Sequence, residues 1–277
     1  MLKAGFINFM PFGTQGDAYY DYLKTYAEIG YKGFEGGNSL TRGDLEANLA
    51  RVRSYGIEPI DIGEALNGFG GPEASPEEVV ELCHKLGVRR ITCFNNQASA
   101  YRFLSRPEPA SYDEIMQEIE TFEKKAAFYA KEGIDFMYHN HDTEFTQIYR
   151  GVPQYQLIAA NTEYLTFELD CGWASYAGAD PVKLIHQLGK RISALHVKDY
   201  QPTTQPYRFG DRVVEQIVVP SFTAVGSGRL DLYGCLKAGD EEGIEWAIVE
   251  QDFLNKLDHK QTLACAYYNM KETGFVE

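Results

Sequence analysis

Short apolar runs alternate with longer amphipathic segments along the whole chain. The short runs are rich in β-branched and aromatic residues, whereas the longer segments place apolar residues at i, i+3 and i+4. The first pattern predicts strands and the second predicts helices. The expected strands lie at residues 3–9, 32–37, 57–63, 89–95, 134–140, 164–170, 191–197 and 245–251.

An amphipathic segment follows each expected strand, and many of these segments carry helix-terminal signals. Asp, Ser or Pro often precedes them, and several end at a glycine, namely Gly30, Gly56, Gly87, Gly133 and Gly189. Alternating strands and helices predict a parallel sheet, and eight such units predict a closed (β/α)8 TIM barrel of the α/β class. We expect one domain over residues 1–277. A doubly wound open sheet is the alternative, but no GxGxxG motif follows the first strand.

The composition is ordinary for a globular chain, with 44% hydrophobic and 24% charged residues among 277. No apolar run approaches the roughly 18 residues of a membrane span, and the start "MLKAGFINFMPFG" lacks the pattern of a signal peptide. We therefore expect a cytoplasmic protein without a membrane partner. Five scattered cysteines without a CxxC pair argue against a disulfide framework or a thiolate zinc site.

The formal net charge is −14, with a pI near 4.9. Such a surface repels phosphate backbones, so we expect no nucleic-acid partner. A small neutral sugar or a divalent cation remains compatible with this charge. The sequence leaves open whether the chain forms a homo-oligomer.

Histidines and carboxylates stand at the ends of four consecutive expected strands. The fifth ends in "YHNHDTEF", which contains His139 and His141, and Asp170, His196 and Glu250 end the sixth, seventh and eighth. In a (β/α)8 barrel these strand ends meet at the functional face. Imidazole and carboxylate ligands without a thiolate suit Mn²⁺, Zn²⁺, Co²⁺ or Mg²⁺. The sequence predicts one divalent metal ion there, with either His139 or His141 as the fifth-strand ligand.

The two-residue period of a strand predicts how the fifth strand end is arranged. Met137 should face the barrel interior, with His139 above it and His141 above that. Asn140 should point between strands and hold the neighbouring backbone.

Three stretches resemble the xylose-isomerase-like TIM-barrel superfamily, and within it the sugar phosphate isomerase/epimerase-like proteins. They are "YHNHDTEF", "ELDCGWASYAGADPVKLIHQLGKRISALHVKDY" and "AVGSGRLDLYGCLKAGDEEGIEWAIVEQD". The resemblance implies one divalent metal on Glu, Asp, His and Glu from the last four strands. Asp170, His196 and Glu250 match the last three. Aligning "HNH" with the family's "EnH" pattern puts His139 where that family usually has Glu.

The resemblance further implies a sugar isomerase or epimerase, which moves a proton at a carbon next to a carbonyl. Glu250 would keep one proton-carrying role, and His139 replaces the other carboxylate. The remaining catalytic candidates are His141, Glu144 and Lys198. Two of these have a non-catalytic alternative. Glu144 could merely orient a histidine, and Lys198 could merely form an ion pair with Asp199 or Asp231.

Four further residues are candidates for binding substrate. Trp173, three residues after Asp170, could stack on a sugar ring or anchor its loop. Glu35 and Asn95 follow expected strands and could bind hydroxyl groups, although each could simply be a polar loop residue. Arg208 lies in the long connection 201–222, which we expect to be a loop, and could bind a phosphate or pair with a nearby acid.

Two other classes of function stay open. The first is a lyase that acts on a keto-polyol, as the resembling keto-inositol dehydratases do, or on a 3-keto-glycoside. Elimination needs one base and one acid rather than two symmetric carboxylates, so the missing Glu favours it. The second is a nucleic-acid repair enzyme, because apurinic endonucleases share the expected fold, but the charge of −14 opposes it.

Overall fold

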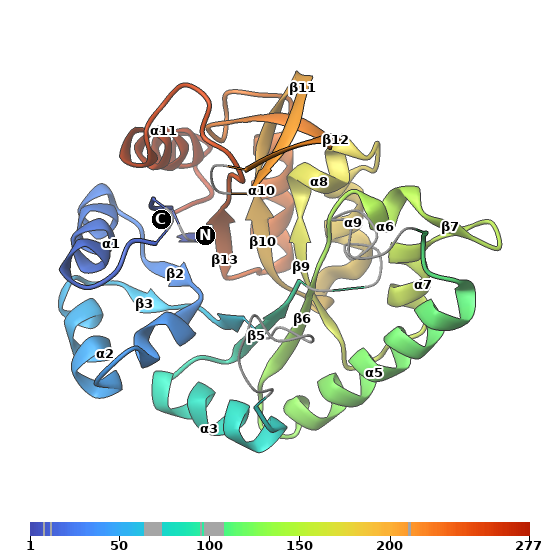
Figure 1. The fold of residues 1–277 in the computed structure, drawn as a ribbon, viewed down its shortest axis with the longest axis horizontal. Coiled ribbons are helices and arrows are strands. Elements are labelled where there is room, and N and C mark those ends of the chain that lie inside the picture. Colours follow the sequence, from blue (N-terminus) through green and yellow to red (C-terminus); the bar gives the residue numbers. More distant parts are fainter. Residues whose placement is uncertain (8, 12, 64–73, 95, 97–107, 210–211) are drawn as a thin grey trace.

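Nine parallel strand segments form a nearly closed ring in the computed structural model (Figure 1). The structure describes residues 1–277 except 8, 12, 64–73, 95, 97–107 and 210–211. Around the ring lie β3 (Glu58–Pro59), β2 (Gly33–Glu35), β1 (Lys3–Ile7), β13 (Trp246–Val249), β10 (Ile192–Val197), β9 (Thr166–Asp170), β6 (Asp135–His139), β5 (Arg90–Cys93) and β4 (Ile62–Gly63).

The two outermost segments of this order, β3 and β4, both belong to the single strand expected at 57–63. β3 pairs with β2 and β4 pairs with β5, so the third strand joins both sides of the ring. This arrangement confirms the expected (β/α)8 barrel and excludes the doubly wound open sheet.

Helices surround the ring (Figure 1). They are α1 (Asp17–Ile29), α2 (Leu45–Ser54), α3 (Pro76–Leu86), α5 (Tyr112–Ala130), α7 (Gln154–Ala160), α9 (Pro181–Leu188), α10 (Leu232–Glu242) and α11 (His259–Glu272). Helix α3 illustrates why they begin and end where they do. Ser75 and Glu78 form a capping box at its start, and Gly87 takes a left-handed φ of 76° at its end. Among the described helices, none has both the length and the apolar character to cross a membrane.

Shorter elements fill the connections between these units. They are the 3-10 turns η1 (Gly37–Thr41) and η2 (Gly189–Arg191), the helices α6 (Thr143–Thr146) and α8 (Cys171–Tyr176), and the small hairpin of β7 (Ile148–Tyr149) and β8 (Val152–Pro153). Helices α6 and α8 begin just after β6 and β9, at the face where the candidate site lies.

An apolar layer fills the barrel interior, made of Ile60, Met137, Ala194, Trp246 and Ile248. Met137 is fully buried there, as its place on the fifth expected strand predicts. A Cβ on Gly33 would lie 2.8 Å from the Trp246 ring, so the glycine makes room for the indole. The layer forms a dry floor beneath the polar strand ends.

A long antiparallel hairpin stands where we expected a loop. It consists of β11 (Asp199–Phe209) and β12 (Arg212–Thr223) and follows β10 directly (Figure 1). Ile217, Val219 and Phe222 pack against Trp173 at its base. The expectation of a loop was wrong because strand pairing satisfies the backbone of this β-branched segment.

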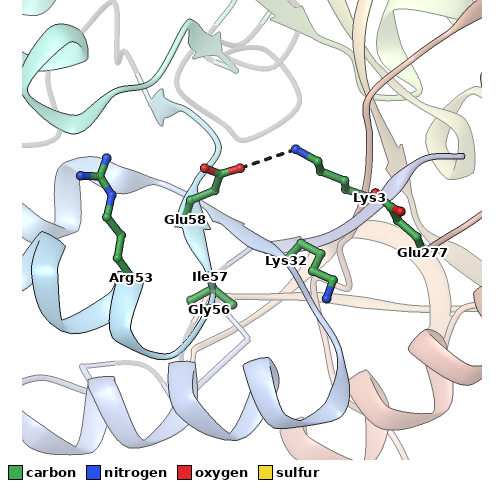
Figure 2. A pocket seen from close by; sticks show the side chains of 7 residues that line it. All are labelled: Lys3, Lys32, Arg53, Gly56, Ile57, Glu58 and Glu277. Carbon is green, nitrogen blue, oxygen red and sulfur yellow. Dashed lines mark ion pairs between the residues drawn. The ribbon is translucent and has the colours of Figure 1, made fainter.

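A pocket of about 470 Å³ opens at the amino ends of the strands, on the face opposite to the candidate site (Figure 2). Lys3, Lys32 and Arg53 line it together with Glu58 and Glu277, and Lys3 forms an ion pair with Glu58 at 3.7 Å. Because barrel chemistry belongs to the carboxyl face, we assign no catalysis to this pocket.

Candidate functional site

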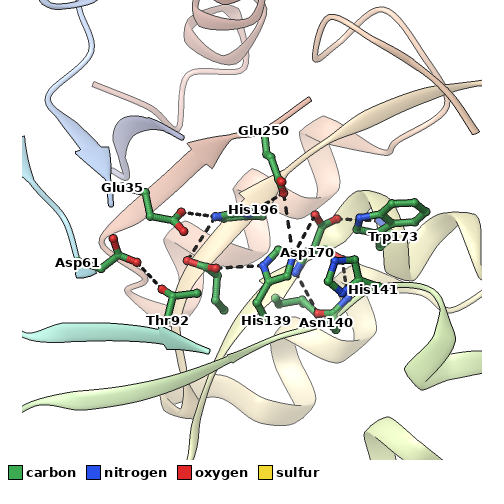
Figure 3. Close-up of polar contacts among 12 residues, drawn as sticks. Glu35, Asp61, Thr92, His139, Asn140, His141, Asp170, Trp173, His196 and Glu250 are labelled. Carbon is green, nitrogen blue, oxygen red and sulfur yellow. Dashed lines mark hydrogen bonds and ion pairs between the residues drawn. The ribbon is translucent and has the colours of Figure 1, made fainter. Parts of the chain in front are cut away.

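Two neighbouring strand pairs bring the ligand-type side chains together above the apolar floor. In the parallel register of β6 and β9, His139 lies opposite Glu168. In the register of β9 and β10, His196 lies opposite Asp170. Side chains at matched positions of adjacent strands lie on the same face, so the strands deliver two imidazoles and two carboxylates to one place (Figure 3).

The side chains of His139, Asp170, His196 and Glu250 converge. One nitrogen or oxygen atom from each lies within 4.8 Å of the corresponding atoms of the other three. Glu250 Oε2 lies 2.9 Å from His196 Nδ1 and 4.0 Å from His139 Nε2, and Asp170 Oδ2 lies 4.0 Å from the same His139 nitrogen. A metal ion bound by all four would lie roughly 2.0–2.3 Å from each ligand atom.

The hydrogen bonds of Asp170 fit a metal ligand. Its Oδ1 accepts from the backbone N–H of Trp173 at 2.7 Å, which begins α8. Its Oδ2 is buried and accepts no hydrogen bond from the described residues, although Lys198 Nζ lies 3.3 Å away. A buried carboxylate oxygen without a hydrogen bond is costly unless a cation faces it. Lys198 is the cation that faces this oxygen, and the donor set of two imidazoles and two carboxylates suits a divalent ion.

Each histidine also contacts a carboxylate through its other ring nitrogen. His139 Nδ1 lies 3.0 Å from Glu168 Oε2, and His196 Nε2 lies 2.5 Å from Glu35 Oε2. If both nitrogens carry the proton and donate it, His139 Nε2 and His196 Nδ1 keep their lone pairs for a metal. Carboxylate contacts of this kind are typical of metal-binding histidines.

The two outer carboxylates have opposite pKa shifts. Burial and the nearby charge of Glu168 raise the pKa of Glu35 to about 7. Burial would also raise the pKa of Glu168, but His196 and His139 more than offset it and lower that pKa. We had expected Glu35 to bind substrate hydroxyls. The structure places it against His196 with only 5% of its surface exposed (Figure 3).

Glu250 is the partly open member of the cluster, with 19% of its side chain exposed. Burial would raise its pKa, but Lys198 and His196 lower it well below the usual value. Glu250 is therefore ionised at neutral pH, as both a metal ligand and a proton acceptor must be.

Lys198 lies among three carboxylates. Its Nζ is 2.8 Å from Asp252, 2.9 Å from Glu250 and 3.3 Å from Asp170. Burial alone would lower the pKa of Lys198, but these three carboxylates raise it above its ordinary value. The side chain is 1% exposed and stays an ammonium group, so it offsets negative charge rather than acting as a base.

Lys198 does not form the alternative ion pairs with Asp199 or Asp231. Asp199 instead accepts four backbone N–H groups, from Tyr200, Gly226, Gly228 and Leu230. Asp231 caps the start of α10 through the N–H of Gly234. Both carboxylates hold turns next to the site instead of pairing with the lysine.

Glu144 is fully buried just beyond β6. Its two oxygens accept from the side chains of Asn96, Tyr138 and Thr143 and from the backbone N–H of His141. A carboxylate engaged by four donors holds the turn after β6 and is poorly placed to transfer a proton to a substrate.

His141 and Trp173 lie side by side at the edge of the cluster. The half-buried His141 ring is 5.1 Å from the ring of His139 and 5.9 Å from Trp173. Trp173 is only 2% exposed and packs edge-on against Phe222 of the hairpin, 5.2 Å away. The structure thus places Trp173 as an anchor for the hairpin, whereas His141 is only half-buried.

Asn140 joins β6 to β9. Its side-chain Oδ1 accepts from the backbone N–H of Asp170 at 3.0 Å, and its Nδ2 donates to the Asp170 carbonyl at 3.2 Å. This confirms the predicted backbone-holding role. Asn95 and the side chain of Arg208 lie outside the described residues, so their expected contacts with substrate stay predictions.

Sequence reasoning missed two acidic residues of this site, Glu168 and Asp252, and one buried acid beside it, Asp61. Glu168 and Asp252 each stand two residues from an expected ligand, so the strand period was a usable signal for Glu168. Asp61 is fully buried and accepts from Thr92 and from the backbone N–H of Gly36. It lies within the third expected strand, between β3 and β4, so the strand-end rule does not find it.

Comparisons with known proteins agree with the fold. Residues 23–262 match the model of the xylose isomerase-like TIM barrel family, and the chain belongs to that family. The inosose dehydratase of Geobacillus kaustophilus (strain HTA426) is 24% identical over 262 residues, which cover 87% of this chain and 82% of that protein.

Solved structures share the fold at low identity. A sugar phosphate isomerase/epimerase from Parabacteroides distasonis ATCC 8503 has a TM-score of 0.73 and 18% identity, with 100% of this chain and 98% of that chain covered. The IOLI protein, crystallised with a zinc atom, has a TM-score of 0.67 and 16% identity, with 98% of both chains covered. The family and these neighbours place the chain in an enzyme superfamily that includes isomerase/epimerase neighbours and dehydratase relatives.

Proposed function

We propose that this chain is a divalent-metal-dependent enzyme that removes a proton from a carbon next to a carbonyl group of a carbohydrate. One observation carries the proposal, namely the convergence of His139, Asp170, His196 and Glu250 at the carboxyl face of the barrel. A divalent ion held there would act as a Lewis acid for the anion that forms when the proton leaves. Which metal fills the site is open among Mn²⁺, Zn²⁺, Co²⁺ and Mg²⁺.

We assign the proton transfers to two groups of the chain. Glu250 is ionised and is 19% exposed, so it can accept a proton from a substrate carbon. His141 is half-buried, and its ring lies 5.1 Å from that of His139, so it can exchange a proton with a substrate oxygen. Such positioned acids and bases contribute about 10²–10⁴-fold to a rate.

The difference between these two groups favours elimination. In a lyase reaction the C–H bond next to the carbonyl breaks, its proton goes to the base, and the bond to the β-oxygen breaks as an acid protonates that oxygen. One carboxylate and one imidazole match these unequal tasks. The inosose dehydratase relative supports the same outcome, so we place a lyase acting on a keto-polyol or a 3-keto-glycoside first.

An isomerase or epimerase is the second candidate, although the family resemblance in the sequence put this class of reaction first. The observation behind it is the structural similarity to the sugar phosphate isomerase/epimerase of Parabacteroides distasonis. In that reaction the proton returns to a carbon of the same substrate, and nothing leaves. A small carbohydrate is the proposed substrate in both cases, and the charge of −14 argues against a nucleic acid.

The test begins with metal analysis and metal-loaded protein. A panel of ketoses, keto-inositols and 3-keto-glycosides is incubated in D₂O and followed by NMR. Loss of water or of an aglycone identifies a lyase, whereas deuterium entry with rearrangement and no loss identifies an isomerase or epimerase. If no substrate of the panel exchanges a proton with any metal-loaded form, the proposed chemistry is wrong.

A further inference from the structure

Glu168 contacts His139 and His196 of the four-ligand cluster, and with Glu35 and His196 it forms a second group of converging ligand-type atoms. Its residue is 0% exposed, and its place on β9 sets it between the histidines of β6 and β10. Oε2 lies 3.0 Å from His139 Nδ1, whereas Oε1 lies 3.3 Å from His196 Nε2 and accepts no hydrogen bond from described residues. Of these two contacts, only the one with His139 has the geometry of a hydrogen bond.

The two nitrogens of His139 face different groups. Nδ1 faces Glu168, while Nε2 faces Asp170 and Glu250, each at 4.0 Å. An imidazole that donates its Nδ1 proton to a carboxylate keeps the Nε2 lone pair free and gains basicity at that atom. No other described side chain hydrogen-bonds His139 Nδ1.

We infer that Glu168 is a positioning residue that holds His139 in the tautomer and ring orientation needed to bind the divalent ion. The inference rests on the proposed metal site. A buried carboxylate is unfavourable unless a partner compensates its charge, and the hydrogen bond with His139 supplies part of that compensation. Outer carboxylates of this kind typically change metal affinity by about 10–100-fold when replaced.

Asp61 offers a matched control in the same buried layer. It is also 0% exposed, but it bonds Thr92 and the backbone N–H of Gly36 rather than a histidine. Asp61→Asn therefore changes a neighbouring buried carboxylate while the contact of His139 with Glu168 stays intact.

The experiment titrates Zn²⁺ and Co²⁺ into the metal-free protein by calorimetry, without any substrate. Glu168→Gln should weaken binding by about 10–100-fold and alter the visible spectrum of bound Co²⁺, because Gln cannot reproduce the charge behind the imidazole. Asp61→Asn should bind within about threefold of the parent protein. Thermal unfolding of the metal-free variants checks the fold, and Glu168→Asp replaces Glu168→Gln if the latter does not fold.

A double-variant cycle separates positioning from a general electrostatic effect. If Glu168 acts through His139, Glu168→Gln should cost much less affinity when His139→Ala is already present. Unchanged affinity in Glu168→Gln, or equal losses with and without His139, would overturn the inference. Because the experiment measures metal affinity and not turnover, it tests the role of Glu168 even if the proposed reaction is wrong.

Discussion

The side-chain amide of Asn140 bonds both the backbone N–H and the backbone carbonyl of Asp170. This pair of bonds, at 3.0 and 3.2 Å, ties the end of β6 to the end of β9. The two strands carry His139 and Asp170, so Asn140 fixes the distance between two candidate metal ligands.

Asn140→Ala should therefore lower both stability and metal affinity. Two buried backbone groups lose their partners, which costs about 2–4 kcal/mol of the free energy of unfolding. Urea denaturation and calorimetric metal titration measure the two effects. Asn269→Ala is the control, because Asn269 bonds the backbone of Val225 away from the cluster. It should lose stability without loss of metal affinity, and equal affinity losses in both variants would contradict the assigned role.

Glu250→Gln should abolish turnover while the fold stays intact, because it removes a ligand charge and a proton acceptor together. Turnover of the substrate identified in the panel is measured beside thermal unfolding. The matched control is Glu245→Gln, since Glu245 directly precedes β13 and lies at the opposite end of that strand. Metal-loaded Glu250→Gln with turnover like that of the parent protein would rule out the proton-carrying role.

Replacing the two histidines of "YHNHDTEF" should affect metal affinity and turnover differently. His139→Ala should lose at least about tenfold in metal affinity, whereas His141→Ala should bind metal normally and lose turnover. His139→Glu should still bind metal with a changed preference among ions, because a carboxylate is a harder ligand. His186→Ala, on the exposed part of α9, serves as the control. Parent-like metal affinity in His139→Ala would end the assignment of the strand-five ligand.

Lys198→Met should destabilise the metal-free protein strongly. The change leaves Asp170, Glu250 and Asp252 without their ammonium partner, and removing one member of a buried ion pair typically costs about 3–5 kcal/mol. A bound divalent ion supplies positive charge at the same place. Thermal unfolding should therefore show a larger metal-induced increase in Tm for the variant than for the parent. An equal increase in both would show that Lys198 does not offset this charge.

Glu245, at the amino face of the barrel, makes a pH-dependent contribution to the free energy of unfolding. Its partial burial would raise its pKa, but Arg90 at 2.7 Å and Lys3 at 3.0 Å lower it. A carboxylate whose pKa is lower in the folded state stabilises the fold at pH values above its unfolded-state pKa. This stabilisation is lost as the pH falls through the folded-state pKa. Glu245→Gln should thus cost about 1 kcal/mol at pH 7, a modest figure because the side chain is 35% exposed. Urea denaturation at pH 7 and near pH 3.5 should show this cost shrinking in acid, and a constant cost would contradict the ion-pair explanation.

The order of strands and helices was predictable from the residues alone, and so were the four strand ends that carry ligand-type side chains. These follow from local rules, since the period of apolar residues sets the element type and parallel strands end at one face. The same period placed Met137 inside the barrel and Asn140 between strands, and the structure confirms both positions. The ligand-type residues at the strand ends could therefore be predicted before any contact was known.

The contacts between particular side chains depend on how the strands and helices pack. The register of β6 on β9 sets Glu168 against His139, and the end of β13 brings Asp252 to Lys198. The pairing of β11 with β12 turned an expected loop into a hairpin whose base covers Trp173. These contacts join residues distant in sequence, and their geometry depends on strand register and packing, which no local pattern of residues specifies.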